Sequence, residues 1–161
     1  MKKFELTGET KLWLGRTLHR IRALVAFGDV GAGEPGGWIE NESNLDQSGN
    51  AWVYGDAQVY GNAQVSGNAQ VYERRAIMWI SVIGSRNDTV TFFACKGGII
   101  GVTVGCFHGS IDEFAEKVRK THGGNEHAQA YMIAIELAKL RVKVEVPAGT
   151  AIPSEHTSKN I

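Results

Sequence analysis

The sequence predicts a mostly β protein plus an α+β unit, organised around a short parallel β-helix. Three observations predict this fold class: a six-residue repeat in the middle of the chain, alternating apolar residues before it, and a β-β-β-α-α pattern after it. The predicted organisation is an N-terminal β cap at 1–37, the repeat at 38–79, an α+β module at 80–146 and a flexible tail at 147–161.

The repeat is clearest in residues 50–72, which read NAWVYGDAQVYGNAQVSGNAQVY. Valines recur every six residues, alanines keep the same interval two places earlier, and glycines follow in step. Neither a helix nor a simple strand has this period, whereas a β-helix built from hexapeptides does. We expect the alanines to allow corners, and each glycine with its following Asn or Asp to adopt the left-handed backbone that corners need.

The number of repeats limits the height of the coil. Three hexapeptides make one triangular turn of about 18 residues, so residues 38–85 hold under three coils. Each inward residue should then stack on the one 18 places later, giving the pairs Val53 with Val71, Val59 with Ile77 and Val65 with Ile83. A stack this short needs capped ends, so the flanking segments should fold against it.

The N-terminal cap is predicted to be a β-hairpin or meander. Residues 3–26 alternate apolar and polar side chains in strand fashion. A helix over LHRIRALVAF competes with this prediction, because leucine, arginine and alanine favour helices. The glycine-rich residues 28–37 should prevent any regular element from continuing.

The C-terminal half predicts three antiparallel strands and two helices. The strands are expected at 76–84, 89–94 and 99–107, separated by polar turns. Ser110 and Glu113 form a capping-box pattern for the first helix, whose apolar face holds Ile111, Phe114, Ala115 and Val118. Asn125 should cap the second helix, with its apolar face formed by Ala128, Met132, Ile135 and Leu137.

Composition narrows the class of protein. Seventeen basic and 17 acidic residues make the chain formally neutral, which disfavours nucleic acid as a partner. Neither a membrane-spanning stretch nor a secretion signal is visible, so we expect a cytoplasmic protein. The cysteines show no zinc spacing, and we expect no metal and no cofactor.

Aromatic side chains gather on the outside of the predicted coil. Trp52, Tyr54 and Tyr72 should share one face, while Tyr60 lies over Met78 on the second. Exposed aromatic residues on one face usually mark a bound partner. Three interpretations stay open: the C-terminal segment covers this face, copies of the chain form a trimer through it, or a foreign partner binds it.

Two polar groupings are candidates for chemistry. The turn Ser85-Arg86-Asn87-Asp88, with Arg74 and Arg75, is a candidate ligand loop for a small nucleotide held between protomers, although such turns are usually only turns. Cys106 and His122 could meet as a nucleophile and base. The alternative is a semi-buried thiol beside a histidine at a helix terminus.

Two family resemblances extend these inferences. The hexads resemble the left-handed β-helix of hexapeptide-repeat proteins, which include acyltransferases and polymer-forming cytoskeletal proteins. The order of LHRIRAL, GGWIENESNL, GNAWVYGDAQVYG, IGSRNDTVTFF, GCFHGSIDEF, THGGN and AIELAK resembles a group of phage and prophage accessory proteins. This second resemblance covers roughly residues 3–142 and implies phage origin, homo-oligomerisation and a short left-handed β-helix ahead of a small α+β module. Together with the elements predicted from the residues, the fold is a short left-handed parallel β-helix of under three coils, capped by an N-terminal β-hairpin and a C-terminal β-β-β-α-α module.

The resemblance to acyltransferases covers only the repeat. Those enzymes are long prisms that use a catalytic histidine, whereas this chain has no histidine between His19 and His108. Our hypothesis is therefore a non-enzymatic, homo-oligomeric binding protein with no catalytic residue. It would inhibit a host antiviral component, either by binding a host protein or by sequestering a nucleotide signal. A hexapeptide-repeat acyltransferase is the alternative.

Overall fold

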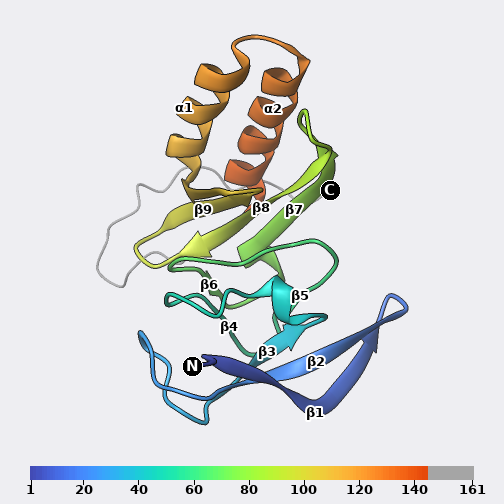
Figure 1. Ribbon diagram of the computed structural model, residues 1–161, viewed down its shortest axis with the longest axis vertical. Coiled ribbons are helices and arrows are strands. Elements are labelled where there is room, and N and C mark those ends of the chain that lie inside the picture. Colours follow the sequence, from blue (N-terminus) through green and yellow to red (C-terminus); the bar gives the residue numbers. More distant parts are fainter. Residues whose placement is uncertain (145–161) are drawn as a thin grey trace, which may run out of the picture.

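The computed structural model describes residues 1–144, so the predicted tail at 147–161 lies outside the described residues. Figure 1 shows a layered molecule with an N-terminal sheet at one end, the coil in the middle, then a second sheet and finally two helices. The strands and helices are β1 Phe4–Trp13, β2 Arg16–Ala23, β3 Pro35–Ile39, β4 Trp52–Val53, β5 Gln58–Val59, β6 Gln70–Val71, β7 Ile77–Ile83, β8 Asp88–Cys95, β9 Ile99–Val104, β10 Phe107–Ser110, α1 Ile111–His122 and α2 Glu126–Arg141.

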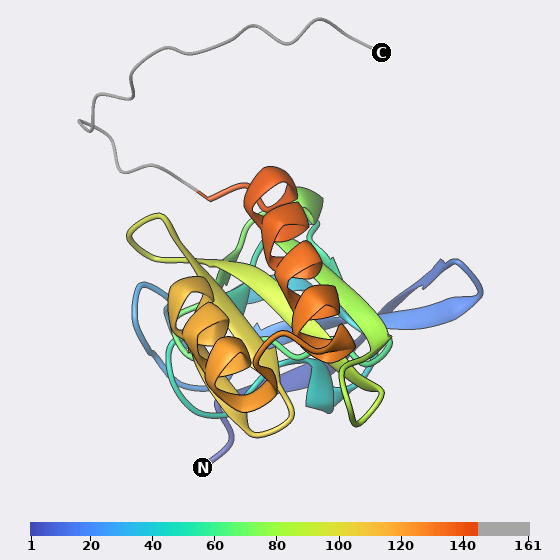
Figure 2. The same cartoon turned by 90° about the horizontal axis from the view of Figure 1, so that it is seen from above.

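The N-terminal cap is an antiparallel hairpin, as predicted. β1 pairs with β2, so the helical alternative over LHRIRALVAF is wrong. The hairpin loop projects away from the body of the molecule (Figure 2). The expectation that no element continues through 28–37 is also wrong, because β3 begins at Pro35. β3 pairs antiparallel with β2 and parallel with β5, and thereby joins the hairpin to the coil.

The repeat region forms two stacked layers with three sides. Parallel pairs define the sides: Ile39 with Val59, Leu45 with Val65, and Val53 with Val71. The predicted stacking of Val53 on Val71 is confirmed. The predicted stacking of Val59 on Ile77 and of Val65 on Ile83 is wrong, because Ile77 and Ile83 belong to β7 and pair with β8. The handedness of the coil stays a prediction.

On two sides of the coil, the stacked residues are further apart in sequence than three hexapeptides. The paired residues are 20 positions apart on two sides (59 − 39 and 65 − 45) and 18 on the third (71 − 53). The two extra residues lie between Leu45 and Val53, which are eight positions apart (53 − 45), whereas Val65 and Val71 are six apart (71 − 65). The 3₁₀ helix at Glu42–Asn44 precedes this segment, where the spacing from Ile39 to Leu45 is still six. Leu45 rather than Gln47 therefore lies opposite Val65, and the Gln47 side chain instead accepts a hydrogen bond from the backbone N–H of Lys3 at 2.8 Å.

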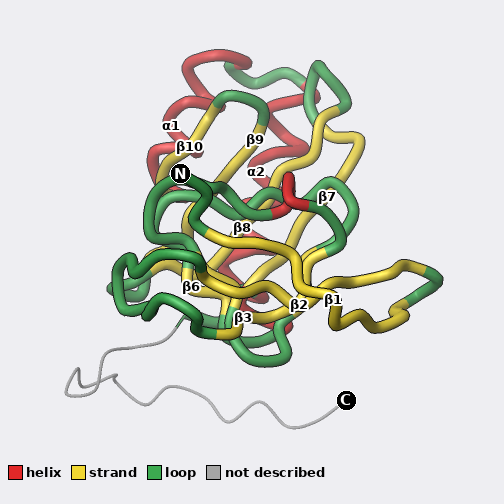
Figure 3. Tube along the Cα trace, turned by 60° about the horizontal axis from the view of Figure 1, so that its bottom comes forward, coloured by secondary structure: helices red, strands yellow, loops and turns green. Residues whose placement is uncertain are grey.

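The corners of the coil follow the predicted chemistry. The four repeat alanines are at most 1% exposed, so each lies inside. The glycines that end successive hexapeptides have positive φ values between 52° and 67°, a backbone conformation that costs a side-chain-bearing residue free energy; they are Gly49, Gly55, Gly61 and Gly67. Most of the coil consists of loops, with short strand segments between them (Figure 3).

The second sheet has four antiparallel strands in the order β10-β9-β8-β7. The strand predicted at 99–107 is two strands, because a turn at Gly105 and Cys106 separates β9 from β10. The sheet begins at Ile77, within residues that the hexapeptide register assigned to a further repeat. An antiparallel bridge from Ala69 to Cys95 links the sheet to the coil.

Both helices cover one face of the second sheet (Figures 1 and 2). The predicted caps are confirmed: Glu113 N–H donates to Ser110 Oγ at 3.2 Å, and Ala128 N–H donates to Asn125 Oδ1 at 3.0 Å. The predicted apolar face of α1 is buried. Leu137 was wrongly placed on the buried face of α2, since it is 42% exposed; the buried residues there are Ala128, Tyr131, Ala134, Ile135 and Ala138.

The described residues form two hydrophobic cores. One fills the coil and the space under the N-terminal cap, and the other lies between the second sheet and the helices. No helix within residues 1–144 is both long and apolar enough to cross a membrane.

Candidate functional site

The predicted aromatic face is only partly exposed. Tyr54 and Tyr72 stack with ring centroids 4.2 Å apart, as expected from neighbouring coils. Trp52 is completely buried, so its assignment to an exposed face is wrong. The N-terminal cap covers Trp52, because the rings of Phe4 and Phe27 pack edge-on against its ring, with centroids 6.3 and 5.3 Å away.

Tyr60 lies in a different groove. The rings of Tyr60 and Trp79 meet edge-on with their centroids 4.8 Å apart, and Met78 lines the same groove. The Arg16 guanidinium lies 5.8 Å from the Tyr60 ring centroid. Tyr60, Trp79 and Arg74 line a groove of about 400 Å³ beside the hairpin. Arg74 also stacks over the Trp13 ring at 4.8 Å, so its charge is placed against the N-terminal cap.

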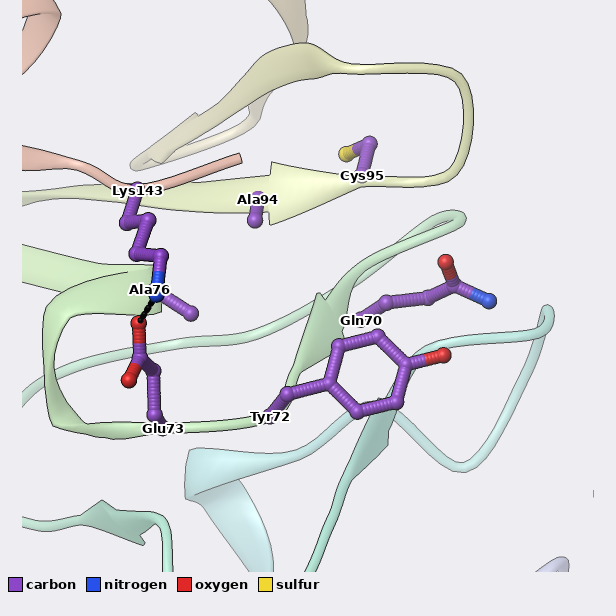
Figure 4. A pocket seen from close by; sticks show the side chains of 7 residues that line it. All are labelled: Gln70, Tyr72, Glu73, Ala76, Ala94, Cys95 and Lys143. Atoms are coloured by element: carbon purple, nitrogen blue, oxygen red, sulfur yellow. Dashed lines mark ion pairs between the residues drawn. The ribbon is translucent and has the colours of Figure 1, made fainter. Parts of the chain in front are cut away.

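A small pocket lies where the coil meets the second sheet (Figure 4). It measures about 170 Å³, and Figure 4 shows Tyr72 and Gln70 on the coil facing Cys95 on β8. Lys143 and Glu73 form an ion pair of 2.9 Å within it. Burial raises the pKa of the Cys95 thiol to about 11, so this thiol is protonated at neutral pH and is a poor nucleophile.

The turn predicted as a ligand loop lines a cavity between the second sheet and the helices. Ser85, Arg86 and Asp88 contribute from the β7–β8 turn, and the opposite walls come from the β9–β10 turn and from α1 and α2. We call this space of about 300 Å³ the helix cavity; its lining is Ser85, Arg86, Asp88, Val104, Gly105, Cys106, Phe107, Phe114, Lys117, Val118, Thr121, His122 and Tyr131.

The predicted loop residues do not all meet there. Asn87 lines a separate depression facing the coil, on the other side of its turn. Arg74 lines the groove beside the hairpin, and Arg75 is exposed and lines neither space. Within one chain, Arg74 and Arg75 thus do not share a cavity with the turn at 85–88. A nucleotide site between protomers that combines all six residues stays a prediction.

The floor of the helix cavity is aromatic. Phe114 contacts Phe107 at 5.3 Å and Tyr131 at 5.2 Å between ring centroids. The His122 ring lies 6.0 Å from that of Tyr131. Flat apolar surfaces of this kind favour a ligand that contains a ring.

Tyr131 brings a hydroxyl to this cavity. The residue is only 7% exposed, and its hydroxyl makes no hydrogen bond to residues 1–144. Burial, with a contribution from the Asp88 charge, raises its pKa, so the hydroxyl keeps its proton. Gly84 makes room for it, because a Cβ at that position would lie 2.1 Å from the hydroxyl oxygen.

Positive charge surrounds the opening of the helix cavity. Arg86 and Lys117 are exposed and form no ion pair within the described part of the chain. His122 adds a third nitrogen-bearing side chain, and Asp88 is the single acidic residue of the lining. Two unpaired cations against one carboxylate favour an anionic ligand.

The sequence prediction missed Lys117 and Tyr131 as members of this site. Both lie on helices far along the chain from the turn at 85–88, so no local spacing could indicate them. The cavity does bring together the suggested pair Cys106 and His122. Cys106 is exposed rather than semi-buried.

A second polar cluster joins the coil to the sheet. Ser66 Oγ lies 2.9 Å from Thr103 Oγ1 and 3.2 Å from His108 Nδ1. Ser66 takes the place that tyrosine has in the other hexapeptides, and its small side chain leaves room for β9 and β10. Ser66 and His108 also line a groove of about 420 Å³. Because these two residues are 42 positions apart in the sequence, no local motif could have predicted the cluster.

Among residues 1–144, no group of three or more His, Cys, Asp or Glu side chains could hold a metal ion. No family model matches the chain. A stretch of 37 residues is 51% identical to part of the uncharacterized acetyltransferase YdcK of Escherichia coli strain K12. The similarity covers 23% of this chain and 11% of that protein, so only a short segment of each protein is similar.

Proposed function

We propose that the protein is a non-enzymatic binding protein that holds a small nucleotide in the helix cavity. One observation carries this proposal: Arg86 and Lys117, which form no ion pair within residues 1–144, and the hydroxyl-bearing side chain of Tyr131 line one cavity with an aromatic floor. Its volume of about 300 Å³ lies at the lower end of the range typical of small-molecule sites.

Each part of a nucleotide finds a matching group. The planar fork of Arg86 and the ammonium of Lys117 suit a phosphate at the opening. The rings of Phe107 and Phe114 suit a base. The Tyr131 hydroxyl would then donate to a base or ribose oxygen inside the cavity.

The same lining supports binding rather than turnover. Phosphate attraction and ring stacking need complementary charge and shape, and neither requires a nucleophile. We therefore assign no catalytic role to Cys106 or His122.

The biological setting is also a proposal. The motif order supports a phage or prophage origin, a homo-oligomer, and action in the host cytoplasm against an antiviral component whose nucleotide signal is sequestered. The hexapeptide resemblance supports left-handed winding of the two coils. A protein-blocking mode would use Tyr54, Tyr60 and Tyr72 without Trp52, which is buried.

Isothermal titration calorimetry tests the ligand class. The probes are 5′-AMP, 5′-GMP and their 3′,5′-cyclic forms, with inorganic phosphate to separate nucleotide binding from simple anion binding. We expect at least one nucleotide to bind with a Kd below about 100 μM, and phosphate to bind much more weakly. The proposal is wrong if no nucleotide binds at millimolar concentration.

A matched pair of variants locates the site. Lys117→Glu reverses a charge in the lining, whereas Lys120→Glu makes the same change on an exposed residue of α1 outside the cavity. Loss of a charge-assisted contact should weaken nucleotide binding about tenfold or more in Lys117→Glu. Equal weakening by both variants would contradict the assignment.

A second candidate function is acyl transfer. It is favoured by the local similarity to the acetyltransferase and by the contact between Ser66 Oγ and His108 Nδ1. Incubation with acetyl-CoA and a panel of amine and hydroxyl acceptors tests it through release of free CoA. Turnover that disappears in His108→Ala would support this function and contradict the non-enzymatic proposal.

A further inference from the structure

Helix α2 carries large apolar side chains on two opposite faces. Its buried face packs on the second sheet, while Ile133, Leu137 and Leu140 are 71%, 42% and 78% exposed. Successive helical residues are rotated by about 100°, so these three lie within about 60° of one another around the helix. We call them the α2 stripe.

The α2 stripe has the pattern of a helix interface. A helix that is apolar all round is normally buried, and exposed apolar patches mark contact surfaces. The spacing of four and then three residues places Ile133 at d, Leu137 at a and Leu140 at d of a heptad. No other described element covers the face of α2 that points away from the sheet (Figures 1 and 2).

Charges beside the stripe indicate its partner. Glu136 at position g lies on one side and Arg141 at position e on the other. When two parallel copies pair in register, g of one helix meets the e residue five places later on its neighbour, so Glu136 meets Arg141. Antiparallel pairing would instead place the Glu136 side chains of two copies along the same side of the seam.

Both charges are available for this contact. Arg141 forms no ion pair within the described residues, and Glu136 is bound only by Lys139 of its own helix at 3.4 Å. That bond is exposed and of a kind that contributes little free energy.

We propose that the α2 stripe joins parallel copies of this chain. Leu137 at a with Ile133 at d matches the pattern that favours three or four strands, whereas the other d residue is Leu140; we commit to a trimer as the assembly to be tested. The stripe spans about 12 Å of helix, a small contact, so we expect a weak association that depends on protein concentration. This inference rests on the exposure and flanking charges of α2 and not on the helix cavity.

Sedimentation velocity from about 5 to 200 μM tests the proposal on the full chain. We expect a concentration-dependent shift from monomer to trimer. Leu140→Glu should leave a monomer over this range, whereas Leu12→Glu, at an equally exposed leucine on the hairpin, should assemble as the wild type does. Circular dichroism confirms that both variants fold.

A charge exchange distinguishes parallel pairing from any other use of the stripe. Glu136→Arg and Arg141→Glu should each weaken assembly about threefold to tenfold, and the double variant should recover most of that loss. The proposal is overturned by a wild-type monomer at the highest concentration, by normal assembly of Leu140→Glu, or by a double variant weaker than either single one.

Discussion

Replacing Asn44 with alanine tests how the two coils are held together. This side chain is 1% exposed and lies in the 3₁₀ helix of the first coil. Its amide nitrogen donates to the carbonyl oxygens of Gly61 and Ala63 at 3.0 and 2.9 Å, and its oxygen accepts from the Asn41 N–H at 2.8 Å. Asn44 therefore bridges the coils from the inside.

The expected cost follows from these three hydrogen bonds. Each contributes about 1 kcal/mol net, so Asn44→Ala should lower the free energy of unfolding by about 3 kcal/mol. For a domain of this size that corresponds to a fall in Tm of about 6–12 °C. Urea unfolding followed by circular dichroism measures it, with the exposed Asn62→Ala as control. A loss below about 1 kcal/mol, or one equal to that of the control, would refute the bridging role.

Three further predictions concern buried groups. Trp52→Ala should cost about 3–5 kcal/mol in urea unfolding because it empties the core under the cap; a loss no larger than that of Tyr72→Ala would contradict this. Desolvation lowers the pKa of Lys3 from 10.5 to about 8, so between these pH values the unfolded state binds more protons than the folded state. The free energy of unfolding of the wild type should therefore rise with pH over this range relative to that of Lys3→Met. If the two proteins show the same dependence of stability on pH, the predicted linkage is wrong. Iodoacetamide at pH 8 should alkylate the exposed Cys106 quickly and Cys95 slowly, as read by intact mass, and equal rates would be inconsistent with burial of Cys95.

Features encoded by neighbouring residues were predictable from sequence. The capping box of Ser110 and Glu113 and the cap at Asn125 depend on residues three positions apart, and both are present. The same holds for the stacking of Val53 on Val71, because uninterrupted hexapeptides connect them.

Features that depend on packing between distant segments could not be predicted from the sequence. The first coil has two extra residues between Leu45 and Val53, and the repeat itself carries no sign of this insertion. Trp52 follows the outward alternation of its strand, yet the cap buries it. The helix cavity unites the turn at 85–88 with Lys117 and Tyr131, which only the docking of the helices on the sheet brings together.

Alkylation of Cys106 tests the proposed nucleotide site most directly, because this exposed thiol lines the helix cavity. The rate of iodoacetamide addition is measured by intact mass with and without the nucleotide that binds most tightly in calorimetry. A saturating nucleotide should slow alkylation of Cys106 about tenfold or more in the wild type, and much less in Lys117→Glu at the same concentration. An unchanged rate with the nucleotide bound would place the ligand elsewhere and contradict the proposed site.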